Sequence, residues 1–377
     1  MRVYLDNAAT TPLDKEVLDA MLPVLKDGFG NPSSTHSYGR KIKSLIERAR
    51  KNVARHINCT PGEIFFTSGG TEADNMAIRC AVKDLGIKHI VTSTIEHHAV
   101  GHTIDRLKAK GLVDVIYVHL DENGHVDLQH LDQVLSTSAK TLVSLMHANN
   151  EIANLLPLDR VSEICQKHGA VFHSDTVQTM AHYRFDMQAL EQVHFLACSA
   201  HKFHGPKGVG FLYVNKSVQI NPLIHGGSQE RNMRGGTENV YGIVGLSKAM
   251  DVAFKDLDTH QAHVMYLKSY MIEQLNNSIV GVKYNGDSSS MDNSLYTVLS
   301  VSLPPTDIAP MMLFNMDIMG VACSGGSACT SGSNIGSHVL EGIEAPNDRP
   351  TIRFSFSRFN TKEEIDYAVD CLVKLYS

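Results

Sequence analysis

The chain has 377 residues, of which 34 are Lys or Arg and 40 are Asp or Glu, and its formal net charge is −6. A chain of this length predicts a large hydrophobic core with a second, smaller unit beside it. The mildly acidic balance, without a basic block, argues against nucleic acid and against an anionic membrane surface as partners.

The cysteines indicate a compartment for the protein. Their number is odd, and their spacing is not that of a small disulfide-rich domain, which predicts free thiols in a reducing compartment. They are Cys59, Cys80, Cys165, Cys198, Cys323, Cys329 and Cys371. The N-terminal segment lacks the apolar core of a signal peptide, and no later run is long enough to span a bilayer. We therefore expect a cytoplasmic protein with no membrane partner.

Strands and helices alternate through the first half of the chain. Nearly continuous apolar runs predict strands at 63–67, 89–92, 113–118, 141–146, 170–173 and 195–198. Helical spacing of apolar residues predicts helices at 14–26, 38–56, 99–110, 128–135 and 161–168. This alternation predicts an α/β fold with a parallel sheet that is covered on both faces. In such sheets the functional site lies at the carboxyl ends of the strands.

The pattern changes after Gly242. A long amphipathic helix at 245–276 precedes strands at 296–301 and 351–355 and a last helix at 362–375. We expect a smaller α+β unit here, which the N-terminal residues join. The predicted division is a large domain over 14–257 and a small domain made of 1–13 and 258–377.

One stretch places unusual chemistry at the end of a predicted strand. Ser199-Ala200-His201-Lys202 follows an apolar run and leads into a Gly-Pro-Lys-Gly turn. A lysine held there can bond covalently to a carbonyl cofactor, with Ser199 and His201 available to a phosphate. The alternative is a solvated loop lysine.

Three further polar clusters follow predicted strands. Gly70-Thr71 begins a helix after a glycine turn and offers N–H and hydroxyl donors to an anion, although many turns look the same. Asp175 and Gln178 suit a pyridinium nitrogen and a ring oxygen, or Asp175 is a helix cap. His97 can stack on a flat ring, or it is a surface histidine.

The order of motifs resembles that of the NifS/IscS-type cysteine desulfurases, which are pyridoxal-phosphate enzymes of the class V aminotransferase group. The motifs are Gly-Gly-Thr, Glu-His, Asn-Asn-Glu, Asp-x-x-Gln, Ser-x-His-Lys, Arg-Gly-Gly-Thr, Ser-Ala-Cys and Arg-Phe-Ser. The resemblance covers essentially the whole chain and implies the aspartate aminotransferase-like fold of these enzymes. One departure is Ala153, where the family usually has glycine in a turn.

The resemblance implies pyridoxal 5'-phosphate as cofactor and assigns a role to each matching residue. Lys202 matches the lysine that carries the cofactor, Asp175 the partner of the ring nitrogen, and Gln178 the contact of the phenolic oxygen. His97 matches the catalytic histidine that stacks on the ring. The matching phosphate ligands are Gly70, Thr71, Ser199, His201 and, from the neighbouring subunit of a homodimer, Thr237.

The substrate side of the site is implied in the same way. Arg353 matches the arginine that grips the substrate carboxylate, and Arg358 is the nearby alternative. Asn150 matches a contact to cofactor and substrate, with Asn149 as its alternative.

A small-residue run around Cys329 decides the reaction that we expect. Its Gly and Ser flanks predict an exposed thiol, whereas Cys323 is expected to be packed. The spacing of the two cysteines matches no zinc pattern, so no metal is expected. The resemblance then implies conversion of L-cysteine to L-alanine, with the sulfur held as a persulfide on Cys329.

Several alternatives to this function stay open. The sulfur is expected to pass to an acceptor protein such as an iron-sulfur scaffold, whose identity the sequence does not give. Selenocysteine lyase and a related class V aminotransferase are the rivals within the fold. A non-catalytic sulfur carrier is expected to have lost Lys202 or Cys329, and both are present.

Overall fold

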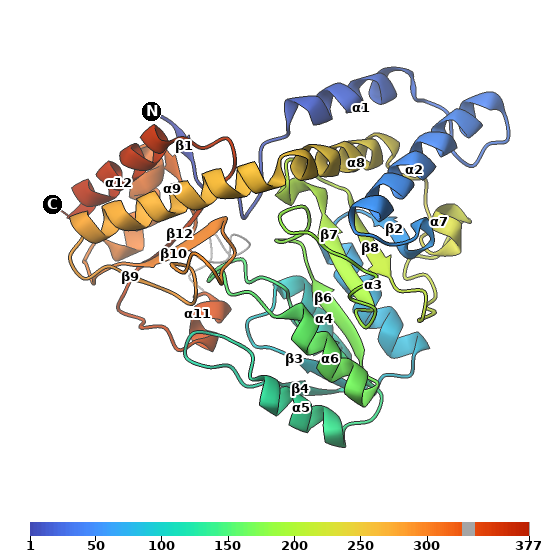
Figure 1. The fold of residues 1–377 in the computed structure, drawn as a ribbon, viewed down its shortest axis with the longest axis horizontal. Helices are drawn as coiled ribbons and strands as arrows, with labels where there is room; N and C mark the ends of the chain where they lie inside the picture. The colour runs from blue at the N-terminus through green and yellow to red at the C-terminus, as the bar shows by residue number, and fades with distance from the viewer. Residues whose placement is uncertain (326–335, 377) are drawn as a thin grey trace.

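The computed structural model describes residues 1–325 and 336–376 (Figure 1). The predictions for Cys329 lie outside the described residues. None of the helices in these two ranges is long and apolar enough to cross a membrane.

A seven-stranded sheet forms the centre of the larger part of the molecule, in the order β2-β8-β7-β6-β5-β3-β4. All neighbours are parallel except β8, which runs antiparallel to β7 and to β2. The short link between β7 and β8 leaves no room for the crossover that a parallel pair needs. The strands are β2 (Ile64–Thr67), β3 (His89–Thr92), β4 (Asp114–Tyr117), β5 (Thr141–Ser144), β6 (Val171–Asp175), β7 (Phe195–Ser199) and β8 (Gly210–Val214).

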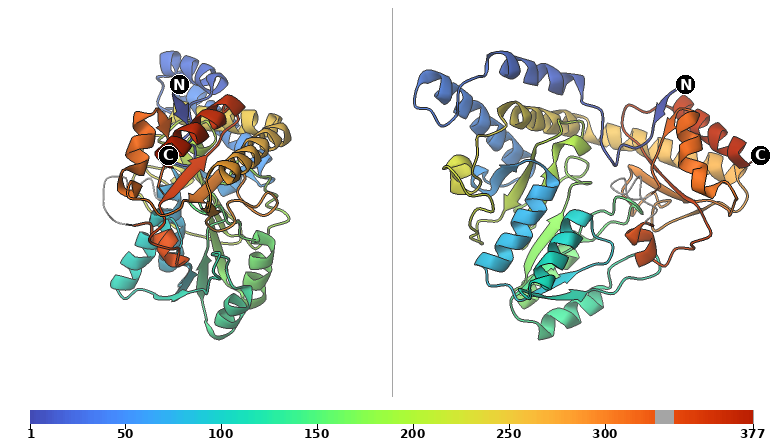
Figure 2. Two further views of the ribbon diagram at one scale, coloured as in Figure 1. Left: turned by 90° about the vertical axis from the view of Figure 1, so that its left-hand side faces the viewer. Right: turned by 180° about the vertical axis from the view of Figure 1, so that it is seen from behind.

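Helices cover both faces of this sheet (Figures 1 and 2). Alternate residues of one strand enter different cores: Phe65 packs with α3 and α4, and Phe66 packs with the helices of the other face. Two-sided burial explains why the strands read as continuous apolar runs. The helices of this part are α1 (Lys15–Asp27), α2 (Ser37–His56), α3 (Gly70–Asp84), α4 (His98–Ala109), α5 (Leu128–Thr137), α6 (Leu158–His168), α7 (Gln229–Asn232) and α8 (Val240–Lys255).

A smaller part lies beside the large sheet, where both chain ends also lie (Figure 1). It contains an antiparallel sheet in the order β12-β10-β9 and a parallel pair of β1 with β11. Its core includes Val3 and Leu5 from the N-terminus. The elements are β1 (Val3–Tyr4), α9 (Leu257–Ser278), β9 (Lys283–Tyr284), β10 (Val298–Ser302), α10 (Met312–Ile318), β11 (Val321–Ala322), α11 (His338–Gly342), β12 (Thr351–Ser355) and α12 (Lys362–Tyr376). The predicted boundaries at 13/14 and 257/258 stay a prediction, since a small cluster of Ala8, Ala148, Ala153, Leu295 and Val298 joins the two parts.

One helix differs from expectation. The single helix predicted at 245–276 is wrong: α8 ends at Lys255 and α9 begins at Leu257, because Asp256 has non-helical torsion angles (φ −126°, ψ 32°). Ala153 adopts a left-handed conformation (φ 66°), which glycine adopts more readily than alanine.

Candidate active site

A cavity of about 500 Å³ opens at the carboxyl ends of the large-sheet strands and is bordered on one side by the smaller part. Most of the predicted site residues line it. These are Gly70, Thr71, His97, Asn150, Asp175, Gln178, Ser199, His201, Lys202 and Arg353. The rule that sites lie at strand carboxyl ends therefore located the cavity correctly.

One end of the cavity is built to receive an anion. Helix α3 begins there, and its N-cap residue Gly69 (φ 150°) offers no side chain to the free N–H groups. A Cβ atom on Gly70 would lie 2.5 Å from Cγ2 of Val177, so only glycine fits there without a shift. Thr71 and Ser199 line the same end and add hydroxyl donors.

Lys202 lies close to the N-terminal segment that crosses the cavity. Its Nζ donates hydrogen bonds to the carbonyl oxygens of Ala8 (2.6 Å) and Ala9 (2.9 Å). Next to it, Nδ1 of His201 lies 3.1 Å from Oγ1 of Thr10, and burial lowers the pKa of His201 to about 4. The His201 ring is therefore neutral at pH 7 and can still donate one N–H to an anion.

Asp175 ends strand β6 as a buried carboxyl group. One of its oxygens, Oδ1, accepts a hydrogen bond from the backbone N–H of Val177 (2.9 Å). Burial raises the pKa of Asp175, whereas its neighbour His97, the hydrogen bond from Val177 and the charge of Lys202 lower it. A cationic ring nitrogen placed at this carboxylate would compensate the cost of its burial. Beside it, Nε2 of Gln178 donates to the carbonyl oxygen of Ala8 (3.0 Å).

His97 caps the N-terminus of α4 and borders the cavity. Its Nδ1 accepts a hydrogen bond from the backbone N–H of Ala99 (3.1 Å), so in the neutral ring Nε2 carries the proton. Burial lowers the pKa of His97 and keeps the ring neutral. The imidazole therefore combines a flat face with one N–H donor.

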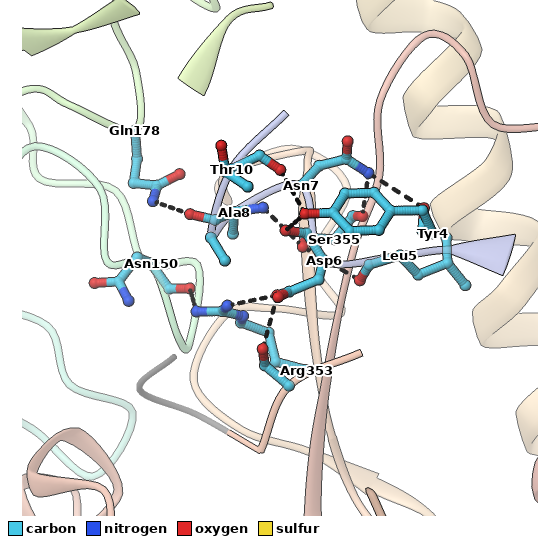
Figure 3. A network of polar contacts seen from close by, with 12 residues as sticks. Tyr4, Leu5, Asp6, Asn7, Ala8, Thr10, Asn150, Gln178, Arg353 and Ser355 are labelled. Atoms are coloured by element: carbon cyan, nitrogen blue, oxygen red, sulfur yellow. Dashed lines mark hydrogen bonds and ion pairs between the residues drawn. The ribbon is translucent and has the colours of Figure 1, made fainter. Parts of the chain in front are cut away.

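Arg353 is held in place from two sides, as Figure 3 shows. Its Nη2 lies 2.9 Å from Oδ1 of Asp6, and its Nη1 donates to the backbone oxygen of Asn150 (3.0 Å). Ser324 also donates to Oδ1 of Asp6 (2.7 Å), at the end of the described segment that precedes Cys329. Since a guanidinium has five N–H groups, donors remain for a carboxylate ligand.

The alternatives left open by the sequence lie elsewhere. Arg358 pairs with Asp14 at 2.6 Å and borders a different pocket. Asn149 is buried, and its Oδ1 accepts backbone hydrogen bonds from Glu151 and Ile152 within a turn. Neither Arg358 nor Asn149 lines the cavity.

Among residues 1–325 and 336–376, one predicted site residue, Thr237, does not line this cavity. Thr237 is exposed and borders a separate hollow of about 230 Å³, which shares Ser68 and Gly208 with the main cavity. Cys329 lies outside the described residues. Cys323 packs against the core of the smaller part, and burial raises the pKa of its thiol to about 12.

The sequence reasoning missed several residues of the site. Asp6 orients Arg353, and Asp74 and His338 border the cavity. A charged residue on the otherwise apolar buried face of a helix, as Asp74 is on α3, is a signal that the sequence offered.

Comparisons with known proteins identify the family. The profile described as Aminotransferase class-V matches residues 3–368. The chain belongs to the class V aminotransferase family. A cysteine desulfurase IscS of Dictyoglomus turgidum is 43% identical over 99% of this chain and 94% of its own length. A putative cysteine desulfurase IscS 1 of Bacillus subtilis is 41% identical over 97% and 96%.

Solved structures agree with this class V aminotransferase assignment. A NifS-like protein superposes with a TM-score of 0.91 at 36% identity and covers 100% of this chain and 99% of its own. A NifS-like protein from Rickettsia africae gives a TM-score of 0.89 at 29% identity, covering 100% and 99%. The predicted aspartate aminotransferase-like fold, the dependence on pyridoxal 5'-phosphate and the enzyme class, a cysteine desulfurase, are confirmed.

Proposed function

We propose that this enzyme takes the sulfur atom from L-cysteine, releases L-alanine and carries the sulfur as a persulfide on Cys329. The observation that carries the proposal is the convergence of an uncapped helix terminus, a buried carboxyl group and a lysine in one cavity. A solved homologous structure described as SspA in complex with cysteine, 31% identical with a TM-score of 0.81, supports the choice of substrate.

The residues of the cavity suit pyridoxal 5'-phosphate. When bound, the cofactor supplies an electron-accepting ring that stabilises negative charge on the α-carbon of the substrate. Thr71, Ser199 and His201 would hold the phosphate together with the free N–H groups of α3. Asp175 would pair with the ring nitrogen, and Gln178 would donate to the phenolic oxygen.

The remaining residues would bind the substrate and move protons. Arg353 would hold the carboxylate of L-cysteine through its free N–H groups, with Asn150 beside it. Lys202 would carry the cofactor and, once its amine is released, take the proton from the α-carbon. His97 would stack on the ring and keep its proton on Nε2.

The sulfur step balances without an added oxidant or reductant. The Cys329 thiolate forms a bond to the sulfur of L-cysteine while the carbon–sulfur bond of the substrate breaks. The β-carbon takes up a proton, so one L-cysteine and one enzyme thiol give one L-alanine and one enzyme persulfide.

A homodimer completes the proposed site. Thr237 is exposed on its own subunit, where it is available to the phosphate of a partner. The same region offers apolar surface for association. Thr237 shortly precedes α8, and α8 packs against α1. On α1, Leu18, Leu22 and Leu25 form an exposed apolar stripe.

The sulfur is proposed to pass from Cys329 to an acceptor protein such as an iron-sulfur scaffold. A cytoplasmic location suits this role, because persulfide chemistry needs reduced thiols. All cysteines among the described residues are free.

A visible spectrum and covalent trapping test the proposal. The purified enzyme should be yellow, and borohydride should fix the cofactor to Lys202. Lys202→Ala and Lys202→Arg should both abolish alanine formation, because neither side chain replaces the primary amine. A colourless protein that cannot be reconstituted with pyridoxal 5'-phosphate would favour a sulfur carrier that has lost catalysis.

A further inference from the structure

A buried carboxyl group that none of the roles above uses borders the cofactor cavity. Asp74 lies on α3 and is 1% exposed. Neither of its side-chain oxygens has a hydrogen-bond partner within residues 1–325 and 336–376. An ionised carboxylate in such surroundings is costly, because it has lost its water and gained no donor.

Asp74 faces the same side of strand β6 as the proposed partner of the ring nitrogen. Side chains alternate along a strand, so His173 and Asp175 point to the face that α3 covers, whereas Phe172 enters the opposite core. Nε2 of His173 lies 3.3 Å from Oδ1 of Asp74. The other ring nitrogen, Nδ1, lies 2.8 Å from Oγ of Ser144.

Three buried carboxyl groups gather here, and they differ in how well each supports a negative charge. Asp175 accepts a hydrogen bond from Val177 and lies near the cationic Lys202. Glu96 accepts hydrogen bonds from the Ser93 hydroxyl and the Met146 N–H through Oε1, and its Oε2 has no partner among the described residues. Asp74 has no such support. Like charges in a buried site cannot all ionise, so the least supported group keeps its proton.

The directions of the pKa shifts agree with this lack of support. The pKa of Asp74 is raised well above its ordinary value by burial first, then by the charges of Asp175 and Glu96. Burial also raises the pKa of Glu96 to about 8. An ion pair of Asp74 with His173 would need a charged imidazole, but burial lowers the pKa of His173 to about 3.

We propose that Asp74 is a protonated carboxylic acid in the folded enzyme and acts as a positioning residue behind Asp175, so that Asp175 alone presents a carboxylate to the ring nitrogen. The proposal rests on the proposed function only in the role that it gives to Asp175. A second ionised group in the same place would compete with Asp175 for the ring's positive charge and draw it from its position.

The pH dependence of stability tests the protonation. A group whose pKa is raised on folding contributes stability at low pH and loses it as the pH rises through the folded pKa. Asp74→Asn resembles the protonated acid and cannot ionise. In urea unfolding of the holoenzyme, its folding equilibrium constant relative to wild type should rise with pH from about pH 5 upward. The rise should be about tenfold per pH unit while Asp74 is ionised in the unfolded chain and protonated in the folded enzyme. For Asp74→Ala, the folding equilibrium constant relative to wild type should be lower at pH 5 but should rise with the same slope. The second variant keeps the test valid if the first folds poorly.

Glu63→Gln is the matched control, since Glu63 is another buried carboxyl group and does not line the cofactor cavity. Hydrogen bonds from Thr60, Lys216 and Tyr213 outweigh burial and lower its pKa. The ionised Glu63 contributes its full stabilisation at every pH above its pKa in the unfolded chain. The folding equilibrium constant of Glu63→Gln relative to wild type should therefore be below one and should not change over the same pH range. A flat ratio for both Asp74 variants would overturn the protonated state of Asp74.

Cofactor affinity tests the positioning role. Stripped Asp74→Asn protein should bind pyridoxal 5'-phosphate more tightly than Asp74→Ala, because the amide restores a neutral group of the same shape behind Asp175. Equal affinities would overturn the positioning role. If wild-type protein bound no pyridoxal 5'-phosphate, the proposed function itself would fail, and the stability slopes would still report on Asp74.

Discussion

Arg353 and Asp6 form an ion pair at 2.9 Å beside the cavity, although 347 positions separate them in the sequence. The side chain of Arg353 is 1% exposed, so its direction is fixed before a substrate arrives. Asp6 also accepts a hydrogen bond from the hydroxyl of Ser324, which links Arg353 to the described segment that precedes Cys329. Such a pre-oriented fork binds a carboxylate with little loss of side-chain entropy.

Replacing the fork with a point charge should weaken substrate binding. Arg353→Lys keeps the charge opposite Asp6 but loses paired donation to the carboxylate, so KM for L-cysteine should rise about 10- to 100-fold. Arg358→Lys is the matched control, because Arg358 forms a similar pair with Asp14 outside the cavity. Its KM should stay close to that of wild type. Steady-state kinetics of alanine release measures both, and the same KM for both variants would place the carboxylate elsewhere.

The end of the cavity at the start of α3, where we propose that the phosphate binds, should not tolerate an added methyl group. Gly70→Ala places a Cβ atom 2.5 Å from Val177, so the loop or the helix terminus must shift. The dissociation constant of pyridoxal 5'-phosphate should increase about tenfold or more. Gly101→Ala serves as control, since a Cβ on this helical glycine of α4 meets no atom within 4 Å. If Gly70→Ala binds the cofactor as well as Gly101→Ala, the phosphate does not lie at α3.

Subunit mixing tests the place of Thr237. Lys202→Ala and Thr237→Ala should each be inactive, yet one site of every mixed dimer would contain both intact residues. Random exchange should therefore restore about one quarter of the wild-type activity per protomer. The Thr237→Ala homodimer must first be shown to be impaired. If verified exchange restores nothing, Thr237 serves its own subunit.

The sequence predicted the parts of the site that depend on local signals. Asp175 and Lys202 follow apolar strands, and parallel strands bring their carboxyl ends to one edge, so their convergence was predictable. The pairing of Arg353 with Asp6 was not, because it needs the N-terminal segment to pair with β11 and to bridge to Ser355 of β12. The break at Asp256 was missed because helical periodicity continues on both sides of it.

The central claim is that Cys329 carries the sulfur as a persulfide, and mass spectrometry after one turnover tests it most directly. Enzyme treated with L-cysteine in the absence of an acceptor should carry one additional sulfur atom on the peptide that contains Cys329. Cys329→Ser should bind L-cysteine but carry no added sulfur and release no alanine, whereas Cys323→Ser should behave as wild type because Cys323 is packed. Added sulfur on Cys323 instead, or alanine release by Cys329→Ser at the wild-type rate, would contradict the account.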